Sequence, residues 1–201
     1  MMEIKWFQRA FIGVGLTAAL SLLVSCAGTQ PGRTGEVPAQ KGQPRITVSE
    51  LEKRIHVLIN EARRKHGLST LAGNDALSRI ARKHSSDMAK RNYFSHYSPE
   101  GHDFLYRYKQ EGYSCSVPVD ERIYLGAENI FQNNLYDRIV YVNDVANYEW
   151  NSMARIAETT VQGWMNSPGH RKNILTPHWK SEGIGVVVSP DDKVYITQNF
   201  C

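Results

Sequence analysis

The sequence predicts an α+β domain, a three-layer α-β-α sandwich in which helices cover both faces of a central antiparallel sheet. Apolar residues recur at helical spacing in four segments between residues 49 and 166. The last part of the chain holds two strand-like runs rich in valine and isoleucine, residues 183–188 and 193–200. The polar segment Ser189-Pro190-Asp191-Asp192 between them is typical of a turn, so the two runs form a hairpin. Runs this apolar indicate strands covered by helices.

The first two helices are the most clearly marked. Ser49 and Glu52 have the spacing of a capping box, which predicts a helix that begins near Ser49 and is stopped by Gly67. Its inward face holds Leu51, Ile55, Leu58, Ile59 and Ala62. The second helix is expected over residues 75–91. His84 lies on its apolar face, where we expect a hydrogen-bonded core histidine rather than a ligand.

The remaining helices are less regular. Ser98-Pro99 predicts the start of a third helix, because proline is favoured at the first helical position, and Gly112 its end. Its inward residues are expected to be Phe104, Leu105 and Tyr108. A fourth helix is expected over residues 155–166, with Ile156, Thr160, Val161 and Trp164 inside. Residues 131–153 are rich in asparagine and tyrosine without a clean period, so we expect a long loop, an insertion that adds specificity.

The N-terminal segment predicts export and lipid anchoring. Lys5 and Arg9 precede an apolar stretch, residues 10–24, that is short for a membrane span and typical of a secretory signal. The stretch ends in Leu22-Leu23-Val24-Ser25-Cys26, which resembles a bacterial lipobox, so we expect cleavage before Cys26 and acylation of its thiol. The alternatives are an ordinary signal peptide or an uncleaved anchor.

These features divide the chain into a signal over residues 1–25, a linker over residues 26–46 and one domain over residues 47–201. The linker is rich in glycine and proline and nearly free of large apolar residues, so we expect a flexible tether of roughly 25 Å. The acylated protein would have the membrane as a partner and lie at the bacterial cell envelope. Because Ala27 is not aspartate, we expect the outer membrane if the host has two membranes.

Charge and cysteine content narrow the possible functions. The whole chain carries a formal charge of +4, too mild to indicate nucleic acid as a partner. Besides Cys26 the chain has Cys115 and Cys201, and an even pair in an exported protein is expected to form a disulfide. Two free thiols are the alternative. The sequence holds no Gly-x-Ser-x-Gly elbow, phosphate-binding loop or His-Glu-x-x-His motif.

Five segments carry a family resemblance. In chain order they are Leu58-Ile59-Asn60-Glu61-Ala62-Arg63, Phe94-Ser95-His96-Tyr97-Ser98-Pro99-Glu100-Gly101, Glu128-Asn129-Ile130, Trp164-Met165-Asn166-Ser167-Pro168-Gly169-His170-Arg171 and Gly183-Ile184-Gly185-Val186. Together they resemble the CAP superfamily of cysteine-rich secretory proteins, insect venom antigens and plant pathogenesis-related proteins, especially its bacterial branch. The resemblance covers nearly all of residues 47–201 and implies the same α-β-α sandwich.

The resemblance also implies a central cavity with two histidines and two acidic residues. His96, His170 and Glu128 match three of these four positions. The fourth position falls on Ser167, so the chain departs from the family pattern, and Glu158 on the same helix is a weak substitute. In some relatives the two histidines bind zinc or another divalent cation, which makes His96 and His170 the candidate metal ligands.

Three roles stay open for the cleft at His96, Glu128 and His170: bracing of the surrounding loops, binding of a metal or ligand, and catalysis. We expect non-catalytic binding of a small apolar or lipid ligand, or of an envelope or host partner. A divalent-metal-dependent hydrolase, a peptidase or nuclease, is one alternative. A structural or adhesive surface protein that acts through residues 131–153 is the other. His102 is a weaker second candidate for the cleft.

Two groups of aromatic side chains bear on an apolar ligand, since family members have been linked to sterols and other lipids. These side chains either line an apolar groove or pack under the long loop, and packing is the simpler interpretation. The first group is Tyr93, Phe94, Tyr97, Tyr106 and Tyr108. The second group is Tyr136, Tyr141, Tyr148 and Trp150.

Overall fold

The computed structural model describes residues 42–201, so the predicted signal, Cys26 and most of the linker lie outside the described residues. The helices are α1 (Val48–Lys65), α2 (Asp75–Arg91), α3 (Phe104–Gln110), α4 (Met153–Asn166) and α5 (Pro168–Ile174). The strands are β1 (Ala72–Gly73), β2 (Val117–Val119), β3 (Arg122–Tyr124), β4 (Ala127–Asn134), β5 (Tyr136–Val142), β6 (Val145–Trp150), β7 (Ser181–Val188) and β8 (Lys193–Phe200). None of the helices within residues 42–201 combines the length and the hydropathy of a membrane-spanning segment.

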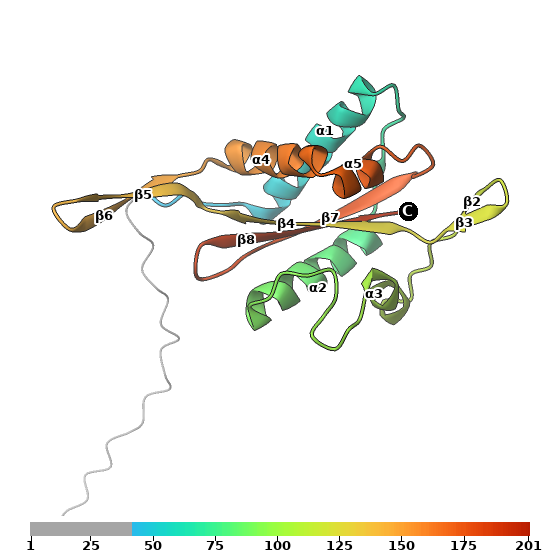
Figure 1. Cartoon of the computed structure of the whole chain (residues 1–201), viewed down its shortest axis with the longest axis horizontal. Helices are drawn as coiled ribbons and strands as arrows, with labels where there is room; N and C mark the ends of the chain where they lie inside the picture. The colour runs from blue at the N-terminus through green and yellow to red at the C-terminus, as the bar shows by residue number, and fades with distance from the viewer. Residues whose placement is uncertain (1–41) are drawn as a thin grey trace, which may run out of the picture. The chain divides into compact units, whose positions relative to one another are not determined.

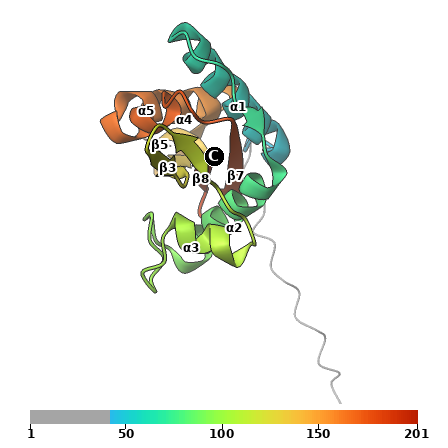
Figure 2. The same cartoon turned by 90° about the vertical axis from the view of Figure 1, so that its right-hand side faces the viewer.

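The elements form three layers. A four-stranded sheet in the order β1-β7-β8-β4 lies in the middle. Helices α1, α4 and α5 cover one of its faces, and α2 and α3 cover the other, as the two views show (Figures 1 and 2). The β4–β8 and β7–β8 pairs are antiparallel, and the two-residue β1 pairs with β7 in parallel. The predicted α-β-α sandwich is thus confirmed, with the short parallel strand as an addition.

The core lies largely between the sheet and the helices α1 and α4. It includes Leu51, Ile55, Ile59, Ile156, Trp164, Ile174, Val186, Ile196 and Phe200. The four residues of α4 predicted to face inward are all buried. Trp164 also donates a hydrogen bond of 2.9 Å from Nε1 to the carbonyl of Ile130, which joins α4 to β4. Burial of each large apolar side chain contributes about 1.5–3 kcal/mol, so this face is the main source of stability.

Helix α2 packs directly against β7 because β7 presents glycine there. A Cβ on Gly183 would lie 2.1 Å from the backbone nitrogen of Ser78, and a Cβ on Gly185 would lie 2.0 Å from that of Arg82. The close approach allows Ser85 Oγ to donate a hydrogen bond of 2.9 Å to the carbonyl of Gly185. The glycines of β7 therefore set the depth of α2, which carries His84 and leads into the loop that holds His96.

Buried Arg63 connects α1 to the end of α5. Its Nη1 donates hydrogen bonds of 2.6 Å to the carbonyl of Ile174 and 2.9 Å to that of Thr176. Its Nε donates a bond of 2.8 Å to the carbonyl of Ser69. These bonds satisfy carbonyl groups at a helix end that would otherwise lack partners. The arginine thereby holds α5, the helix that carries His170.

The capping box predicted for α1 is wrong. The helix begins at Val48 with Thr47 as its N-cap, and the Thr47 side chain makes no capping hydrogen bond. Glu52 is instead buried and accepts two hydrogen bonds from Arg82, at 2.7 and 2.6 Å. It also accepts a bond of 3.0 Å from the backbone nitrogen of Val186. A bidentate arginine partner stabilises the carboxylate more than an exposed cap does, so tertiary contact overrides the local pattern.

The start predicted for the third helix is also wrong, because α3 begins at Phe104 and not at Pro99. Gly101 lies between these residues with φ of 84°, a left-handed conformation that interrupts a helix. Asp103 follows and caps α3 by accepting a hydrogen bond from the backbone of its first turn. Leu105, predicted to face inward, is exposed.

Residues 131–153 are not a loop, as the sequence led us to expect. They include the end of β4 and the β5–β6 hairpin, whose turn at Asn143 and Asp144 has φ of 49° and 62°. Positive φ at both turn positions is the geometry of a tight two-residue hairpin. Because the ribbon exposes residues on both of its faces, its sequence shows no polar and apolar alternation. The turn residues were the available signal, since asparagine and aspartate tolerate positive φ.

The predicted disulfide joins Cys115 and Cys201, whose Cα atoms are 5.6 Å apart. Cys115 packs with Leu77, Ile80 and Tyr108 in a small cluster beneath α2. The bond ties the segment after α3 to the last residue of the chain. Backbone nitrogens of residues 180 and 181 also donate to the carbonyl of Cys201, so this end of the chain is held by hydrogen bonds as well.

Candidate functional site

Glu128 lies at the centre of the candidate site. It is the second residue of β4, and its side chain is only 1% exposed. Its Oε1 accepts a hydrogen bond of 2.9 Å from Nδ1 of His96, and its Oε2 accepts one of 2.6 Å from Arg107. Both carboxylate oxygens therefore have a charge-assisted or polar partner, as a buried carboxylate requires.

His96 lies on the loop between α2 and α3, which a backbone turn and two hydrogen bonds fix in place. Helix α2 ends at Arg91, and its C-cap Asn92, with φ of 51°, turns the chain away from the helix axis. His84 Nε2 then donates a hydrogen bond of 3.0 Å to the carbonyl of Ser95. Arg107 donates one of 3.1 Å to the carbonyl of His96 itself. The loop is thus held from both helices, while the imidazole of His96 remains 42% exposed.

Arg107 is a site residue that the sequence patterns did not predict. It binds Glu128 and the carbonyls of His96 and His102, and so joins β4 to the loop before α3. No motif marks it. Its position three residues after Phe104, on the same stripe of a short helix, was the available signal that it faces inward.

His170 meets His96 across the site. The centres of the two imidazole rings are 6.1 Å apart, and their planes are inclined by 46°. His170 is the third residue of the short helix α5, which follows α4 after Ser167. Asn129 donates 3.2 Å to the carbonyl of His170, and Asn173 donates 2.9 Å to Oδ1 of Asn129. These bonds hold α5 against β4 and so fix the separation of the two histidines.

The two histidines next to this centre with shifted pKa values are both neutral at pH 7. Burial, and then the charge of His96, lower the pKa of His170. Burial also lowers the pKa of His84 to about 4, although Glu128 at 3.9 Å opposes the shift. The core role predicted for His84 is confirmed, because the ring is buried and hydrogen bonded. A neutral His170 keeps a lone pair that can bind a metal ion or accept a proton.

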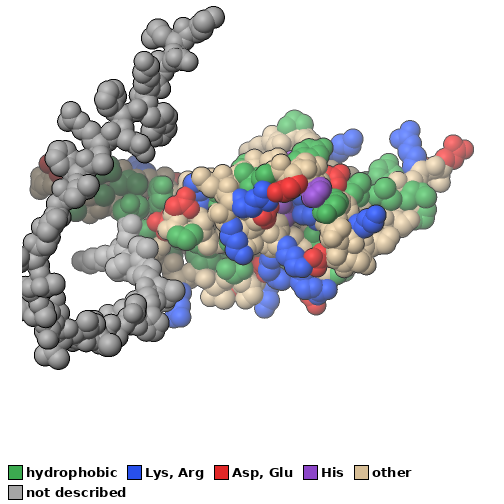
Figure 3. Space-filling view, turned by 90° about the horizontal axis from the view of Figure 1, so that it is seen from below, with side chains coloured by type: hydrophobic (Ala, Val, Ile, Leu, Met, Phe, Trp, Pro, Cys, Tyr) green, Lys and Arg blue, Asp and Glu red, His purple; other side chains and the backbone are tan. Residues whose placement is uncertain are grey.

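The site opens into a groove of about 420 Å³. Its lining comprises His96, Tyr97, Asp103, Phe104, Gly126, Ala127, Glu128 and Asn173. Tyr97 is 59% exposed, so an aromatic face is available beside the polar residues. Lys, Arg and acidic side chains are interspersed over the face formed by α2 and α3, with a histidine at the surface among them (Figure 3). A groove with one aromatic wall and a few placed polar groups suits a small amphipathic ligand.

Several predicted participants lie elsewhere. Ser167 joins α4 to α5 and supplies no carboxylate. Glu158 lines a different groove, between α1 and α4, and so does not substitute for the missing acid. The ring of His102 stacks on Tyr106 at 3.6 Å, and Tyr93 packs with buried residues rather than in the groove. Within residues 42–201 no group of three or more His, Cys, Asp or Glu side chains is arranged to hold a metal ion.

Comparison with known proteins agrees with this arrangement. Residues 57–200 match the model of the CAP family, described as the cysteine-rich secretory protein family. The chain belongs to this family. Two curated relatives from Bacillus subtilis are the uncharacterised protein YkwD, 34% identical over 143 residues, and the uncharacterised membrane protein YlbC, 36% identical over 149 residues. These matches cover 71% and 74% of this chain but 45% and 34% of the relatives, so the chain spans less than half their length.

Solved structures show the same CAP fold. An extracellular protein of Bacillus anthracis with an SCP domain is 29% identical, with a TM-score of 0.55 over 76% of this chain and 40% of that chain. An outer surface protein of Borrelia burgdorferi has a TM-score of 0.56 at 18% identity, over 77% of this chain and 94% of that chain. The second likeness concerns the fold alone.

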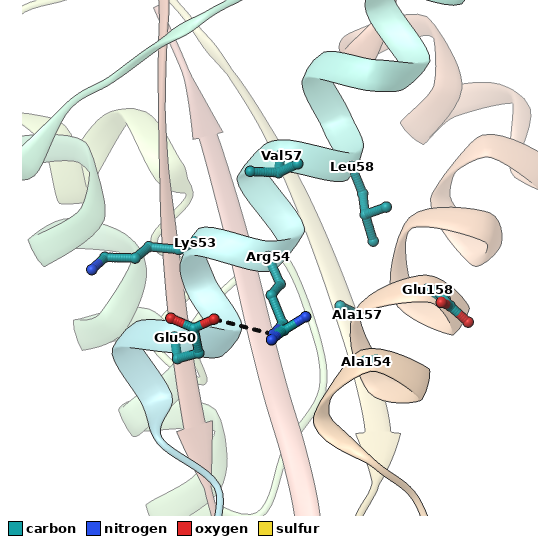
Figure 4. A pocket seen from close by; sticks show the side chains of 8 residues that line it. All are labelled: Glu50, Lys53, Arg54, Val57, Leu58, Ala154, Ala157 and Glu158. Carbon is teal, nitrogen blue, oxygen red and sulfur yellow. Dashed lines mark ion pairs between the residues drawn. The ribbon is translucent and has the colours of Figure 1, made fainter.

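A second groove of the CAP domain lies between α1 and α4, with a volume of about 410 Å³. Its walls are Val57 and Leu58 on α1 and Ala154 and Ala157 on α4 (Figure 4). Arg54 extends between the two helices and pairs with Glu50 at 3.2 Å. The groove therefore combines an apolar floor with an arginine at its rim.

Proposed function

We propose that this protein is a non-catalytic binding module of the bacterial cell envelope, whose ligand lies in the groove at His96, Glu128 and His170. The observation that carries the proposal is the pairing of Glu128. Arg107 and His96 occupy both of its carboxylate oxygens, so Glu128 orients His96 instead of acting as a free base. The exposed imidazole of His96 lines the groove, and the imidazole of His170 lies beside it, with the two ring centres 6.1 Å apart.

A divalent cation fits between the two histidines. A zinc ion shared by two imidazoles, with each Zn–N bond about 2 Å long, places the ring centres roughly 5–6 Å apart. The observed separation of 6.1 Å is close to this range. Two protein ligands leave the other positions of the ion open, so the ion would supply a contact for an oxygen of the ligand. His96 and His170 are the residues that would hold it.

The same geometry argues against a metal-dependent hydrolase. A hydrolase needs a base that takes a proton from the attacking water. Glu128 is the carboxylate beside the two histidines, and it could take that proton only by giving up its hydrogen bond to Arg107 or to His96. The family's second acidic position is Ser167, which cannot replace it. Binding without turnover is the function that these residues support.

Zinc titration calorimetry tests the metal part of the proposal. We expect the metal-stripped protein to bind zinc with a micromolar Kd, and the His96→Ala/His170→Ala variant to lose the binding. His102→Ala is the matched control, because His102 stacks on Tyr106 outside the groove. No zinc binding in the parent protein, or unchanged binding in the double variant, would show that the two histidines only brace the loops.

The α1–α4 groove favours a second candidate function, the binding of a lipid chain. Its volume of about 410 Å³ lies within the usual range for small-molecule sites. Because Arg54 is paired with Glu50, Lys53 is the lining cation available to an anionic head group, and Ala154 and Leu58 offer apolar contacts to a chain. We expect Val57→Glu/Ala154→Glu to abolish binding of a fluorescent fatty acid while leaving zinc binding intact. Unchanged fatty-acid binding in this variant would contradict the assignment.

Location at the envelope rests on the N-terminal signal and on the relatives. The lipobox-like sequence ending at Cys26 supports acylation of the exported protein. One curated relative is named a membrane protein, and one structural relative is described as extracellular. Mass spectrometry of the N-terminal peptide should show a lipid-modified Cys26 with residues 1–25 removed. An unmodified Cys26 thiol would contradict the anchor.

A further inference from the structure

The outer half of the β5–β6 hairpin exposes an unusual amount of apolar surface. Tyr141 is 70% exposed, Val145 62%, Val142 54% and Val140 39%. Val142 and Val145 face each other across the strand pair, directly beside the turn. An exposed apolar cluster at the end of a projecting element is typical of a contact surface (Figure 1).

The inner half of the hairpin has a different construction. Tyr148 stacks on Trp150 with ring centres 5.0 Å apart, and Tyr136 packs edge-on against Tyr148 at 5.5 Å. This aromatic cluster stabilises the root, as a two-stranded ribbon requires because it is marginal by itself. The exposed apolar residues of the outer half do not take part in this cluster.

The chain enters the domain beside the same root. A Cβ on Gly42 would lie 3.6 Å from Cδ1 of Trp150. The next residue, Gln43, donates a hydrogen bond of 2.7 Å to Asp192 in the β7–β8 turn. The segment that leads back to Cys26 therefore leaves the domain at the end from which the hairpin projects.

We propose that the β5–β6 hairpin contacts the lipid surface to which the N-terminus is anchored, with Tyr141, Val142 and Val145 at head-group level. The inference rests on the lipid anchor proposed above. Two lengths support it. Sixteen positions separate Cys26 from Gly42, and a random coil of that length would have a root-mean-square length of roughly 20–24 Å. The seven residues of β5 extend about 23 Å, so the tip reaches the surface that the tether holds nearby.

The side chains and the charge of the hairpin indicate that it contacts neutral lipid through apolar groups. Tyrosine is favoured at the boundary between lipid and water, and valine side chains gain from leaving water. Residues 136–150 contain one cationic side chain, Arg138, and three carboxylates, Asp137, Asp144 and Glu149. Arg138 is paired with Glu149 at 2.8 Å, so residues 136–150 have no cation left to attract an anionic head group. Anionic lipid should therefore weaken the contact rather than strengthen it.

Depth-dependent quenching tests the proposal on the full, acylated chain in phosphatidylcholine vesicles. An environment-sensitive fluorophore is attached to the thiol of Val145→Cys. Cys115 and Cys201 do not compete for this label, because they are joined in a disulfide. The matched control carries the same probe on Asp120→Cys, in the exposed turn of the β2–β3 ribbon. We expect a quencher placed in the lipid head group to quench the probe at 145 several-fold more than the probe at 120.

Further variants sharpen the test. With the probe at 145, Tyr141→Ser/Val142→Ser should lose most of the quenching, and His96→Ala should keep it. Equal quenching at 145 and 120, or none at 145, overturns the proposal, as does failure of the full chain to partition to vesicles. Quenching that rises with phosphatidylglycerol content also overturns it, because the contact is then electrostatic. A spectral shift at 145 that depends on protein concentration without vesicles assigns the tip to a second copy instead.

This outcome is separable from that of the ligand groove. Zinc titration reports on His96 and His170, whereas the probe reports on the hairpin tip. If the parent protein binds no zinc but the probe at 145 is quenched, the proposed ligand site alone is rejected. If the parent protein binds zinc but the probe at 145 is not quenched, the membrane contact alone is rejected.

Discussion

Arg107 and Glu128 form an ion pair of 2.6 Å in which the arginine side chain is 13% exposed and the glutamate side chain 1%. The same guanidinium donates to the carbonyl of His96, whose ring binds the other oxygen of Glu128. One arginine of α3 thus fixes both the backbone and the side-chain partner of a candidate ligand residue. The position of His96 depends on this pair.

We therefore expect Arg107→Met to destabilise the protein by about 3–5 kcal/mol, because it leaves a buried carboxylate without its cationic partner. Urea unfolding measures the loss. Arg91→Met is the control, since Arg91 pairs with Glu100 at the exposed surface, where solvent screening leaves an ion pair little effect on stability. Equal effects of the two substitutions would contradict the buried role. Glu128→Gln in the Arg107→Met background should recover part of the stability.

Stability should rise with pH between about 4 and 6.5 through His84. The pKa of the buried ring is lowered to about 4, whereas the unfolded chain has the ordinary value of about 6.5. In this window the unfolded state binds the proton and the folded state does not, so acidification favours unfolding. His84→Gln should flatten the dependence of the unfolding free energy on pH across this interval. An unchanged slope would assign the dependence to other groups.

The opposite sign is expected for His56. A hydrogen bond of 2.6 Å to buried Glu182 raises the pKa of His56, although burial opposes the shift. The stabilisation is complete below the unfolded pKa of about 6.5 and is lost as the pH rises through the raised value. In His56→Gln, the decline of stability above pH 6.5 should be weaker than in the parent protein. A steeper decline in the variant would show that the sign is wrong.

Gly185→Ala should destabilise the fold by roughly 1–3 kcal/mol or more, because the new methyl group meets the backbone of α2. Thermal unfolding measures this effect. Gly169→Ala on α5 is the matched control, since a Cβ there meets nothing within 4 Å. Alanine is also the better helix former, so the control should be neutral or slightly stabilising. Comparable losses at both positions would contradict direct packing of α2 on β7.

Reduction of the Cys115–Cys201 disulfide should lower the unfolding free energy by about 4.5 kcal/mol in the chain-entropy model, because the bond closes a loop with a sequence separation of 86. Denaturant unfolding with and without reductant measures the difference. The Cys115→Ser/Cys201→Ser variant should be insensitive to reductant. A parent protein that is equally insensitive would indicate that the bond does not form in solution.

Local patterns were sufficient for much of the fold. The inward stripe of α4 and the apolar runs of β7 and β8 are written in the spacing of side chains, and each is buried as predicted. The β5–β6 hairpin could not be predicted from spacing, because neither of its faces is fully covered and its side chains carry no period. The start of α3 was misplaced because proline at residue 99 competes with the left-handed Gly101 that follows it.

The sequence by itself determined the family and the sandwich and indicated His96, Glu128 and His170 as candidates, because motifs and periodicity are properties of neighbouring residues. The tertiary structure decided what these residues do to one another. Arg107 binds Glu128 from 21 positions away, and the two histidines meet across elements 74 positions apart in the chain. Such contacts depend on how closely the helices pack on the sheet. The glycines of β7 set this distance for α2, and Asn129 and Asn173 set it for α5. The spacing of residues along the sequence does not contain this information.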